Sequence, residues 1–230
     1  MGRSLSAKQV LRVKHKTIKM GGVWGDCVGE IDRTGVVFFW GNSGNGKTSA
    51  AVSFCIELCR QGLKGLYMSK EEGISLSMQE TLVRLNAAQC GSKLQFDNGM
   101  DWDEFERKWS KPRSWDFALL DSIQYCQMNY RQYLAFKERH KNKLIIIISH
   151  CDGRVPAGRS AKSIMYDAGL KIWVEGYRAF SKGRFIGPKG SCTIWEEGAQ
   201  KYWGGGKMIT TSKETTLWQR ENTVTRDSMQ

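Results

Sequence analysis

The chain has 230 residues, of which 40% are hydrophobic and 11% aromatic, enough for one globular domain with a sizeable core. Lys and Arg number 35 against 23 Asp and Glu, which gives a formal net charge of +12. This charge favours a polyanionic partner such as nucleic acid, although a basic surface can also serve solubility alone. The longest apolar run, residues 144–148, is too short to cross a bilayer, and we expect no membrane partner.

Cysteine usage points to a reducing compartment. The seven cysteines form no CxxC pair and do not cluster with histidine, which argues against a zinc site. Several of them stand in apolar stretches, as buried free thiols do. The basic N-terminus also lacks the apolar core of a signal peptide. We therefore expect a cytoplasmic protein.

The N-terminal part of the chain lacks a clear periodic pattern. Residues 1–21 carry Lys and Arg but no acidic residue, which predicts a basic arm that is either disordered or laid on a partner. Residues 21–35 are rich in glycine and read as turns. We therefore place the start of the folded core at about residue 22.

From residue 36 the chain alternates between apolar strands and amphipathic helices. The strands are expected at 36–40, 65–69, 93–96, 115–121 and 144–149, and the helices at 47–62, 74–89, 101–109 and 131–141. This alternation predicts an α/β fold with a mostly parallel central sheet covered by helices on both faces. Segments 170–182 and 191–197 predict a C-terminal antiparallel extension, and 204–230 is expected to be a flexible polar tail.

The strand at 36–40 runs into GNSGNGKT, residues 41–48, which matches GxxxxGK[ST] in full. Glycines in such a loop let backbone N–H groups turn toward phosphates, and the following helix points its positive end at the same anion. Lys47 is expected to reach the β- and γ-phosphates of a nucleotide, and the Thr48 hydroxyl to bind Mg²⁺. The sequence therefore predicts an ATP site at Gly41, Asn42, Ser43, Gly44, Asn45, Gly46, Lys47, Thr48 and Ser49.

Two further groups complete a candidate hydrolytic site. Asp121 ends an apolar strand, where a carboxylate is expected to hold the Mg²⁺. Glu71 and Glu72 follow the strand at 65–69, and carboxyl ends of neighbouring parallel strands face one crevice. Either glutamate could orient the attacking water, or the KEE segment could be a solvated helix start.

The order of these motifs resembles the RecA-type ATPases, which include RadA, the DnaB helicases and KaiC. The glutamates in YMSKEEG, the LLDS ending at Asp121 and Ser122, and the strand IIIISHCDG carry the resemblance. It implies a RecA-like core over residues 22–203. It also implies that Ser149 or His150 senses the γ-phosphate.

The resemblance extends to SKGRFIGPKG, which is similar to a late hairpin of RadA and DnaB. It implies that Lys182 and Arg184 act on the ATP site of a neighbouring subunit, where a guanidinium stabilises developing phosphate charge. Gly183 and Ile186 depart from the RadA pattern, so the register of the pair is open. A basic β-turn without this role is the alternative.

In RecA-type recombinases two loops bind single-stranded DNA: the loop after the strand with the metal-binding carboxylate and the loop after the strand that senses the γ-phosphate. Here these loops correspond to residues 122–131 and 151–162. Arg154, Arg159 and Lys162 in the second loop are the expected DNA-binding residues. In the first loop Tyr125 and Tyr130 could stack on bases or pack inside, and Tyr125 is the one expected in the core.

With little beyond the core, the chain looks most like small single-domain recombinases of phages, so we expect a bacterial or phage-infected host cell. We therefore predict a DNA-dependent ATPase that acts on single-stranded DNA in recombination, annealing or repair. Its expected partners are further copies of the chain, in a ring or filament with ATP at the subunit seams, and a single-strand-binding protein. The alternatives are a helicase-like hexameric motor and a KaiC-like regulatory ATPase that does not bind DNA.

Overall fold

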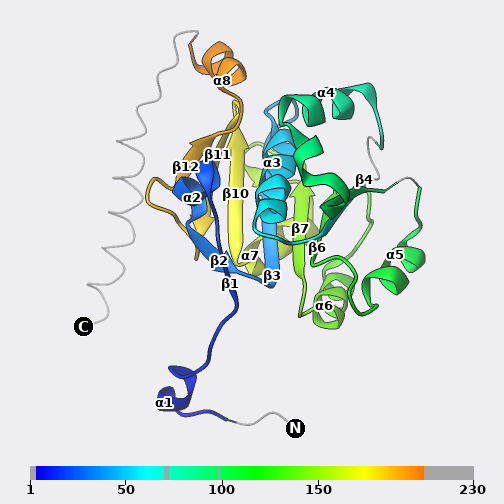
Figure 1. Ribbon diagram of the computed structural model, residues 1–230, viewed down its shortest axis with the longest axis vertical. Helices are drawn as coiled ribbons and strands as arrows, with labels where there is room; N and C mark the ends of the chain where they lie inside the picture. Colours follow the sequence, from blue (N-terminus) through cyan, green and yellow to red (C-terminus); the bar gives the residue numbers. More distant parts are fainter. Residues whose placement is uncertain (1–3, 70–72, 98, 205–230) are drawn as a thin grey trace.

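The computed structural model describes residues 4–69, 73–97 and 99–204. Its centre is an eight-stranded sheet in the order β12-β11-β10-β3-β7-β6-β4-β5 (Figure 1). The parallel strands are β3 (Gly35–Trp40), β4 (Gly65–Ser69), β5 (Leu94–Phe96), β6 (Phe117–Asp121), β7 (Leu144–Ser149) and β10 (Leu170–Glu175). β11 (Arg178–Gly183) and β12 (Ser191–Thr193) add the antiparallel extension. The predicted fold class is confirmed.

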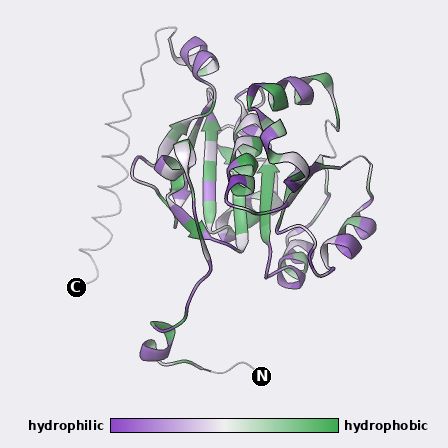
Figure 2. Ribbon diagram, viewed as in Figure 1, coloured by the Kyte–Doolittle hydropathy of each residue, from purple (hydrophilic) through white to green (hydrophobic). Residues whose placement is uncertain are grey.

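Helices cover both faces of this sheet and bury two apolar clusters. Along β3, Val37 and Phe39 face one cluster, whereas Phe38 and Trp40 face the other, as the period of two in a strand requires. The first cluster lies under α2 (Gly22–Val28), α3 (Lys47–Arg60), α4 (Leu76–Arg84) and the 3-10 helix η1 (Ala87–Lys93). The second lies under α5 (Trp102–Trp109), α6 (Tyr130–Arg139) and α7 (Arg159–Asp167). Figure 2 shows apolar central strands surrounded by helices of mixed hydropathy.

The glycine-rich segment 21–35 is not a run of turns, as predicted, but contains a helix and a strand. α2 buries Trp24, Cys27 and Val28, which recur at helical spacing. Trp24 packs edge-on against Phe54 at 5.0 Å between ring centroids. The glycines hid this helix because they lower helix propensity, whereas packing of the apolar side decides the outcome.

The segment assigned to the basic arm also contributes to the core. β1 (Thr17–Lys19) pairs antiparallel with β2 (Glu30–Asp32), and Ile18 and Met20 are buried. Only residues 4–16, including the short helix α1 (Ala7–Val10), are exposed throughout. The packed chain therefore includes residues of the segment before residue 22.

Other elements differ in extent from the prediction. The helix expected at 74–89 ends at Arg84, and η1 follows it. The antiparallel stretch expected at 191–197 ends at Thr193, where α8 (Glu196–Trp203) takes over. Trp203 donates its indole N–H to the Gly176 carbonyl at 2.9 Å, so tertiary contact holds this short helix in place.

The cysteines match the expectation of free thiols. None of the seven is in a disulfide, and Cys27, Cys55, Cys59 and Cys90 are buried. Burial, with Cys90 close by, raises the pKa of Cys59 to about 12, so this thiol stays protonated at neutral pH. Among the helices that the structure describes, none has the length and apolar character to cross a membrane.

Candidate functional site

The glycine loop between β3 and α3 has the backbone conformation that a phosphate-binding loop needs. Gly44 and Gly46 have φ of 73° and 88°, in the left-handed region that favours glycine. A Cβ on Gly46 would lie 2.6 Å from the Tyr177 ring, and one on Gly41 would lie 2.1 Å from the Val174 carbonyl oxygen. Larger residues at these positions would displace the wall of the site.

Hydrogen bonds tie this loop to the turn between β10 and β11. The backbone N–H groups of Gly176 and Tyr177 donate to the side-chain and backbone oxygens of Asn45, at 2.9 and 3.1 Å. The Lys47 ammonium donates to the Asn42 carbonyl at 3.0 Å. The loop is thus preorganised, with its lysine already folded over it.

The loop opens onto a cavity of about 430 Å³ at the carboxyl ends of the parallel strands. Of the predicted site residues, it is lined by Ser43, Gly44, Gly46, Lys47, Thr48, Ser49, Asp121 and His150. Gly41, Asn42 and Asn45 do not line the cavity. They hold the shape of the loop through the contacts just given.

Asp121 lies at the tip of β6, opposite Ser69 at the tip of β4. It is buried and accepts a hydrogen bond from the Tyr67 hydroxyl. Within the described ranges there is no cluster of three or more His, Cys, Asp or Glu that could hold a metal by itself. The Thr48 hydroxyl and the Asp121 carboxylate both line the cavity, and Mg²⁺ is usually bound by one or two protein oxygens of this kind together with the nucleotide phosphates.

The predicted catalytic glutamates, Glu71 and Glu72, lie outside the described residues. The described part of β4 ends at Ser69, which lies beside Asp121. Their role stays a prediction.

The strand β7 ends in two residues that the sequence left as alternatives. Ser149 is fully buried, accepts from the Gln124 amide at 2.9 Å and donates to the His150 carbonyl at 2.8 Å. The Ser149 hydroxyl therefore holds the loop that follows β6, whereas His150 lines the cavity.

One wall of the cavity was not predicted from the sequence. Arg84 of α4 donates to the Ser49 hydroxyl at 2.8 Å, and its guanidinium lies 4.6 Å from the ring centroid of Trp195. Tyr177 meets Trp195 edge-on at 4.8 Å between ring centroids. These planar groups suit a nucleobase, since stacking and cation–π contacts favour flat rings. No local motif signals this wall, because its members come from three distant segments.

The second predicted DNA loop forms a small hairpin, β8 (Cys151–Asp152) with β9 (Val155–Pro156), followed by α7. Arg154 lies at its turn, and Arg159 and Lys162 lie in the first turn of α7; all three are exposed. The hairpin contacts the nucleotide loop directly. The Trp40 indole donates to the Arg154 carbonyl at 3.1 Å, and the Cys151 thiol donates to Asn42 at 3.1 Å. Burial raises the pKa of Cys151, which keeps it protonated as this donor.

The expectation that Tyr125 packs in the core is wrong. Its side chain is 51% exposed, with its ring 6.2 Å from the His150 ring. Tyr130 instead begins α6 and stacks on the buried Tyr133 at 5.9 Å. The sequence could not distinguish them because both stand in a polar segment without periodicity.

Lys182 and Arg184 lie beside the amino ends of the parallel strands, whereas the cavity lies at their carboxyl ends. Gly183, between them, pairs with Leu170, whose other neighbour is Val37 near the start of β3. The glycine loop begins after the far end of that strand. The two exposed cations therefore do not line the cavity of their own chain.

No protein-family model matches the chain, and no curated protein matches it in sequence. Among solved structures, it is similar to a KaiC-like protein from the hyperthermophilic archaeon Pyrococcus horikoshii OT3, with 14% identity and a TM-score of 0.52 over 78% of this chain and 99% of that one. The flagellar accessory protein FlaH from Methanocaldococcus jannaschii matches with 16% identity and a TM-score of 0.48, over 70% of this chain and 82% of FlaH. Together with the strand order and the glycine loop, the first similarity shows that the chain has a RecA-like P-loop fold.

Proposed function

We propose that the chain binds ATP and Mg²⁺ in the cavity and hydrolyses ATP when it binds single-stranded DNA, in recombination, annealing or repair. The contact between the glycine loop and the β8–β9 hairpin is the observation that carries this proposal. Trp40 and Asn42, on either side of the start of the loop, bond to Arg154 and Cys151 of the hairpin. A nucleotide that shifts the loop therefore acts on the proposed DNA-binding segment through two hydrogen bonds.

The chemistry is assigned to residues at the cavity. Lys47 would bind the phosphates, and Thr48 and Asp121 would hold Mg²⁺, which neutralises charge on the phosphate oxygens when bound. Glu71 or Glu72 would orient the attacking water. Arg84 and Trp195 would hold the base, and His150 would face the terminal phosphate.

The site needs a second copy of the chain. Lys182 and Arg184 would reach the cavity of a neighbouring subunit, which requires a ring or a filament with ATP at each seam. Because they lie at the end of β11, away from their own cavity, such an arrangement brings that corner of one subunit to the cavity of the next. This is a heterologous contact, which closes into a ring or continues as a filament.

DNA would bind at the carboxyl ends of the parallel strands through Arg154, Arg159 and Lys162, with the exposed Tyr125 as a stacking surface. Cations that follow the phosphates and aromatic rings that stack on bases are the usual components of a single-strand site. We further propose that the protein acts in the cytoplasm of a bacterial or phage-infected cell. A single-strand-binding protein would be a partner there, and small phage-type recombinases would be its functional counterparts.

The test is ATP turnover by the purified chain with and without single-stranded DNA at low and moderate salt, because phosphate contacts weaken steeply with salt. A DNA-dependent rise that is lost in Glu71→Gln or Glu72→Gln is expected. The double variant Arg154→Gln/Arg159→Gln should lose the rise but keep basal turnover. Strand displacement by the wild-type chain would favour the helicase-like motor instead.

The similarity to a KaiC-like protein supports a second candidate, a regulatory ATPase that does not bind DNA. Turnover that ignores DNA at every salt concentration would favour it.

A further inference from the structure

The amino ends of the parallel strands carry a second set of cations, on the side of the sheet opposite the cavity. Each of the six parallel strands has Lys or Arg at or shortly before its amino end. From one side of the sheet to the other they are Lys93, Lys64, Lys111 and Arg113, Lys141 and Lys143, Arg33, and Lys171, and we call them the amino-edge row.

The strand register aligns these ends. Gly65 pairs with Leu94 and with Phe117, and Leu144 pairs with Phe117 and with Gly35. Six strands spaced about 4.8 Å apart make a row about 24 Å long, the length of about seven base pairs of duplex at 3.4 Å each. The row therefore spans enough of a nucleic acid to contact several phosphates.

Carboxylates at this edge neutralise the row only in part. Asp116 pairs with Arg33 at 3.2 Å, and Glu138 pairs with Lys141 at 2.7 Å. At the end of the row Lys171 lies directly opposite Lys182 on the neighbouring strand, so the line of cations continues onto β11.

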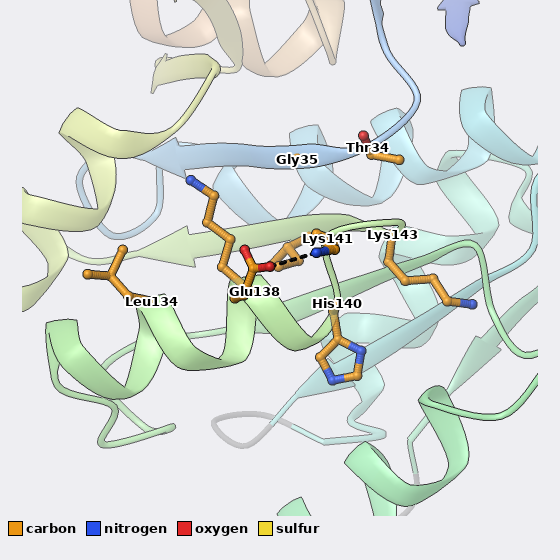
Figure 3. Close-up of a pocket in the computed structure, with 9 residues that line it drawn as sticks. Thr34, Gly35, Leu134, Glu138, His140, Lys141 and Lys143 are labelled. Carbon is orange, nitrogen blue, oxygen red and sulfur yellow. Dashed lines mark hydrogen bonds and ion pairs between the residues drawn. The ribbon is translucent and has the colours of Figure 1, made fainter. Parts of the chain in front are cut away.

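A hollow of about 360 Å³ lies along the row, between α6 and the start of β3 (Figure 3). Lys137, Lys141 and Lys143 line it together with Gly35. The Lys143 ammonium donates to the Ser114 hydroxyl at 2.9 Å and to the Trp115 carbonyl at 2.7 Å, which fixes its position at the amino ends of the strands. In Figure 1 the exposed residues 4–16, with Lys8, Arg12, Lys14 and Lys16, leave the body on this same side.

The aromatic residues indicate which form of nucleic acid would bind. Of the described residues, the large exposed aromatic side chains are Tyr125, Tyr166 and Tyr202. Only Tyr166, near the end of α7, lies toward the amino edge, whereas single-strand sites stack successive bases on several rings. A row of cations almost without stacking surfaces suits the outside of a duplex, where phosphates are the accessible groups.

We propose that the amino-edge row binds the phosphate backbone of double-stranded DNA, on a surface distinct from the nucleotide cavity and from the β8–β9 hairpin. The interaction is electrostatic and independent of base sequence. It would leave the cavity free, because the two edges are separated by the length of the strands.

The test compares two variants that lose the same charge. Lys64→Gln/Lys111→Gln removes two exposed cations of the row, and Arg178→Gln/Lys201→Gln removes two exposed cations of β11 and α8, away from the row. Binding of a labelled 20-bp duplex and of a 20-nucleotide single strand is measured by fluorescence anisotropy over a series of salt concentrations. For the first variant we expect duplex binding about 10–100-fold weaker at ~0.1 M salt and a salt slope smaller by about 2. Single-strand affinity and ATP turnover should change less than about twofold.

The proposal would be overturned by no duplex binding to the wild-type chain, by equal losses of duplex affinity in both variants, or by equal losses for duplex and single strand. A structural role must also be distinguished, because α3, α5 and α6 end at this edge and cations stabilise helix C-termini. Lys93, for example, donates to the Cys59 carbonyl in the last turn of α3 at 3.5 Å. A lower melting temperature with unchanged duplex affinity would favour that role and contradict the proposal.

If the double variant does not fold, the charge-conserving Lys64→Arg/Lys111→Arg and the single Arg113→Asn keep the proposal testable. Arg113 has φ of 62°, which asparagine tolerates. The conservative variant should bind duplex normally, and Arg113→Asn should lower the salt slope by about 1. Neither readout depends on DNA-stimulated ATP turnover, so failure of the proposed function would leave this result separate.

Discussion

The two edges of the central sheet both carry positive charge, but for different physical reasons. At the carboxyl edge α3 begins, and its positive dipole end repels the cations beside it, so Lys47 is held there by the loop and suits a bound anion. At the amino edge the helices end, and their negative dipole ends favour cations. A cation placed against a helix dipole is therefore stronger evidence for a ligand than one placed with it. Because helix ends alone would favour single cations at the amino ends, the evidence for duplex binding is that the cations of the row are aligned and that neighbouring carboxylates neutralise them only in part.

The largest expected effect concerns the two cations that connect the edges. Lys182→Ala and Arg184→Ala should each lower ATP turnover by about 10³-fold or more, because they would remove charge from the site of a neighbouring subunit. ATP binding, measured by calorimetry, should stay within about twofold, since neither residue lines its own cavity.

Lys189→Ala is the matched control, because Lys189 is exposed in the same loop and pairs with Asp26. Normal turnover in both Lys182→Ala and Arg184→Ala would show that these two cations have no part in catalysis.

A similar loss is expected at the carboxyl edge. Lys47→Ala should lower turnover by about 10²–10³-fold, the effect of removing one preorganised group that stabilises developing charge. Unlike the variants at the other edge, it should also weaken ATP binding. Turnover assays with Lys201→Ala as the control check this, and an active Lys47→Ala protein would contradict the assignment of the cavity.

The unpredicted wall of the cavity should give a smaller effect. Arg84→Ala should weaken ATP binding by about tenfold, because the proposed base-binding wall loses the guanidinium that bonds to Ser49 and packs on Trp195. Arg84→Lys keeps the charge but not the planar group, so an intermediate affinity is expected. Unchanged ATP affinity in Arg84→Ala, measured by calorimetry, would remove this wall from the binding site.

The smallest effect concerns a buried histidine near the amino edge. Burial lowers the pKa of His140, which stacks on Trp109 at 4.4 Å and contacts Glu106 at 3.2 Å, although Glu106 opposes the shift. The pKa of His140 in the folded chain therefore lies below the ordinary value of about 6.5. Its contribution to the free energy of unfolding is complete above that pH and is lost as the pH falls through the pKa of the folded state.

His140→Phe should therefore show a smaller loss of unfolding free energy between pH 7.5 and 5.5 than the wild-type chain in urea titrations. Arg139 and Lys143 lie close enough to contribute and are retained in the variant. An identical pH dependence in the two proteins would assign the acid sensitivity to other groups.

Local patterns accounted for the glycine loop, its flanking strand and helix, Asp121, and the parallel sheet. A strand buried on both faces reads as an apolar run, and a phosphate loop needs glycine at fixed positions, so both leave a local signature. The helix of residues 22–28 left none, because glycine masked the spacing of Trp24, Cys27 and Val28. Its stability depends on contact with Phe39 and Phe54, which lie far along the chain.

The glycine loop, the class of fold and the excess of positive charge could all be inferred from the order of residues. Three features became visible only in the folded chain: the contact of Arg84 with Trp195, the hydrogen bonds between the β8–β9 hairpin and the glycine loop, and the alignment of the amino-edge row. The physical reason is that backbone conformation is governed by neighbouring residues, whereas strand order and side-chain contact depend on which distant apolar surfaces pack together.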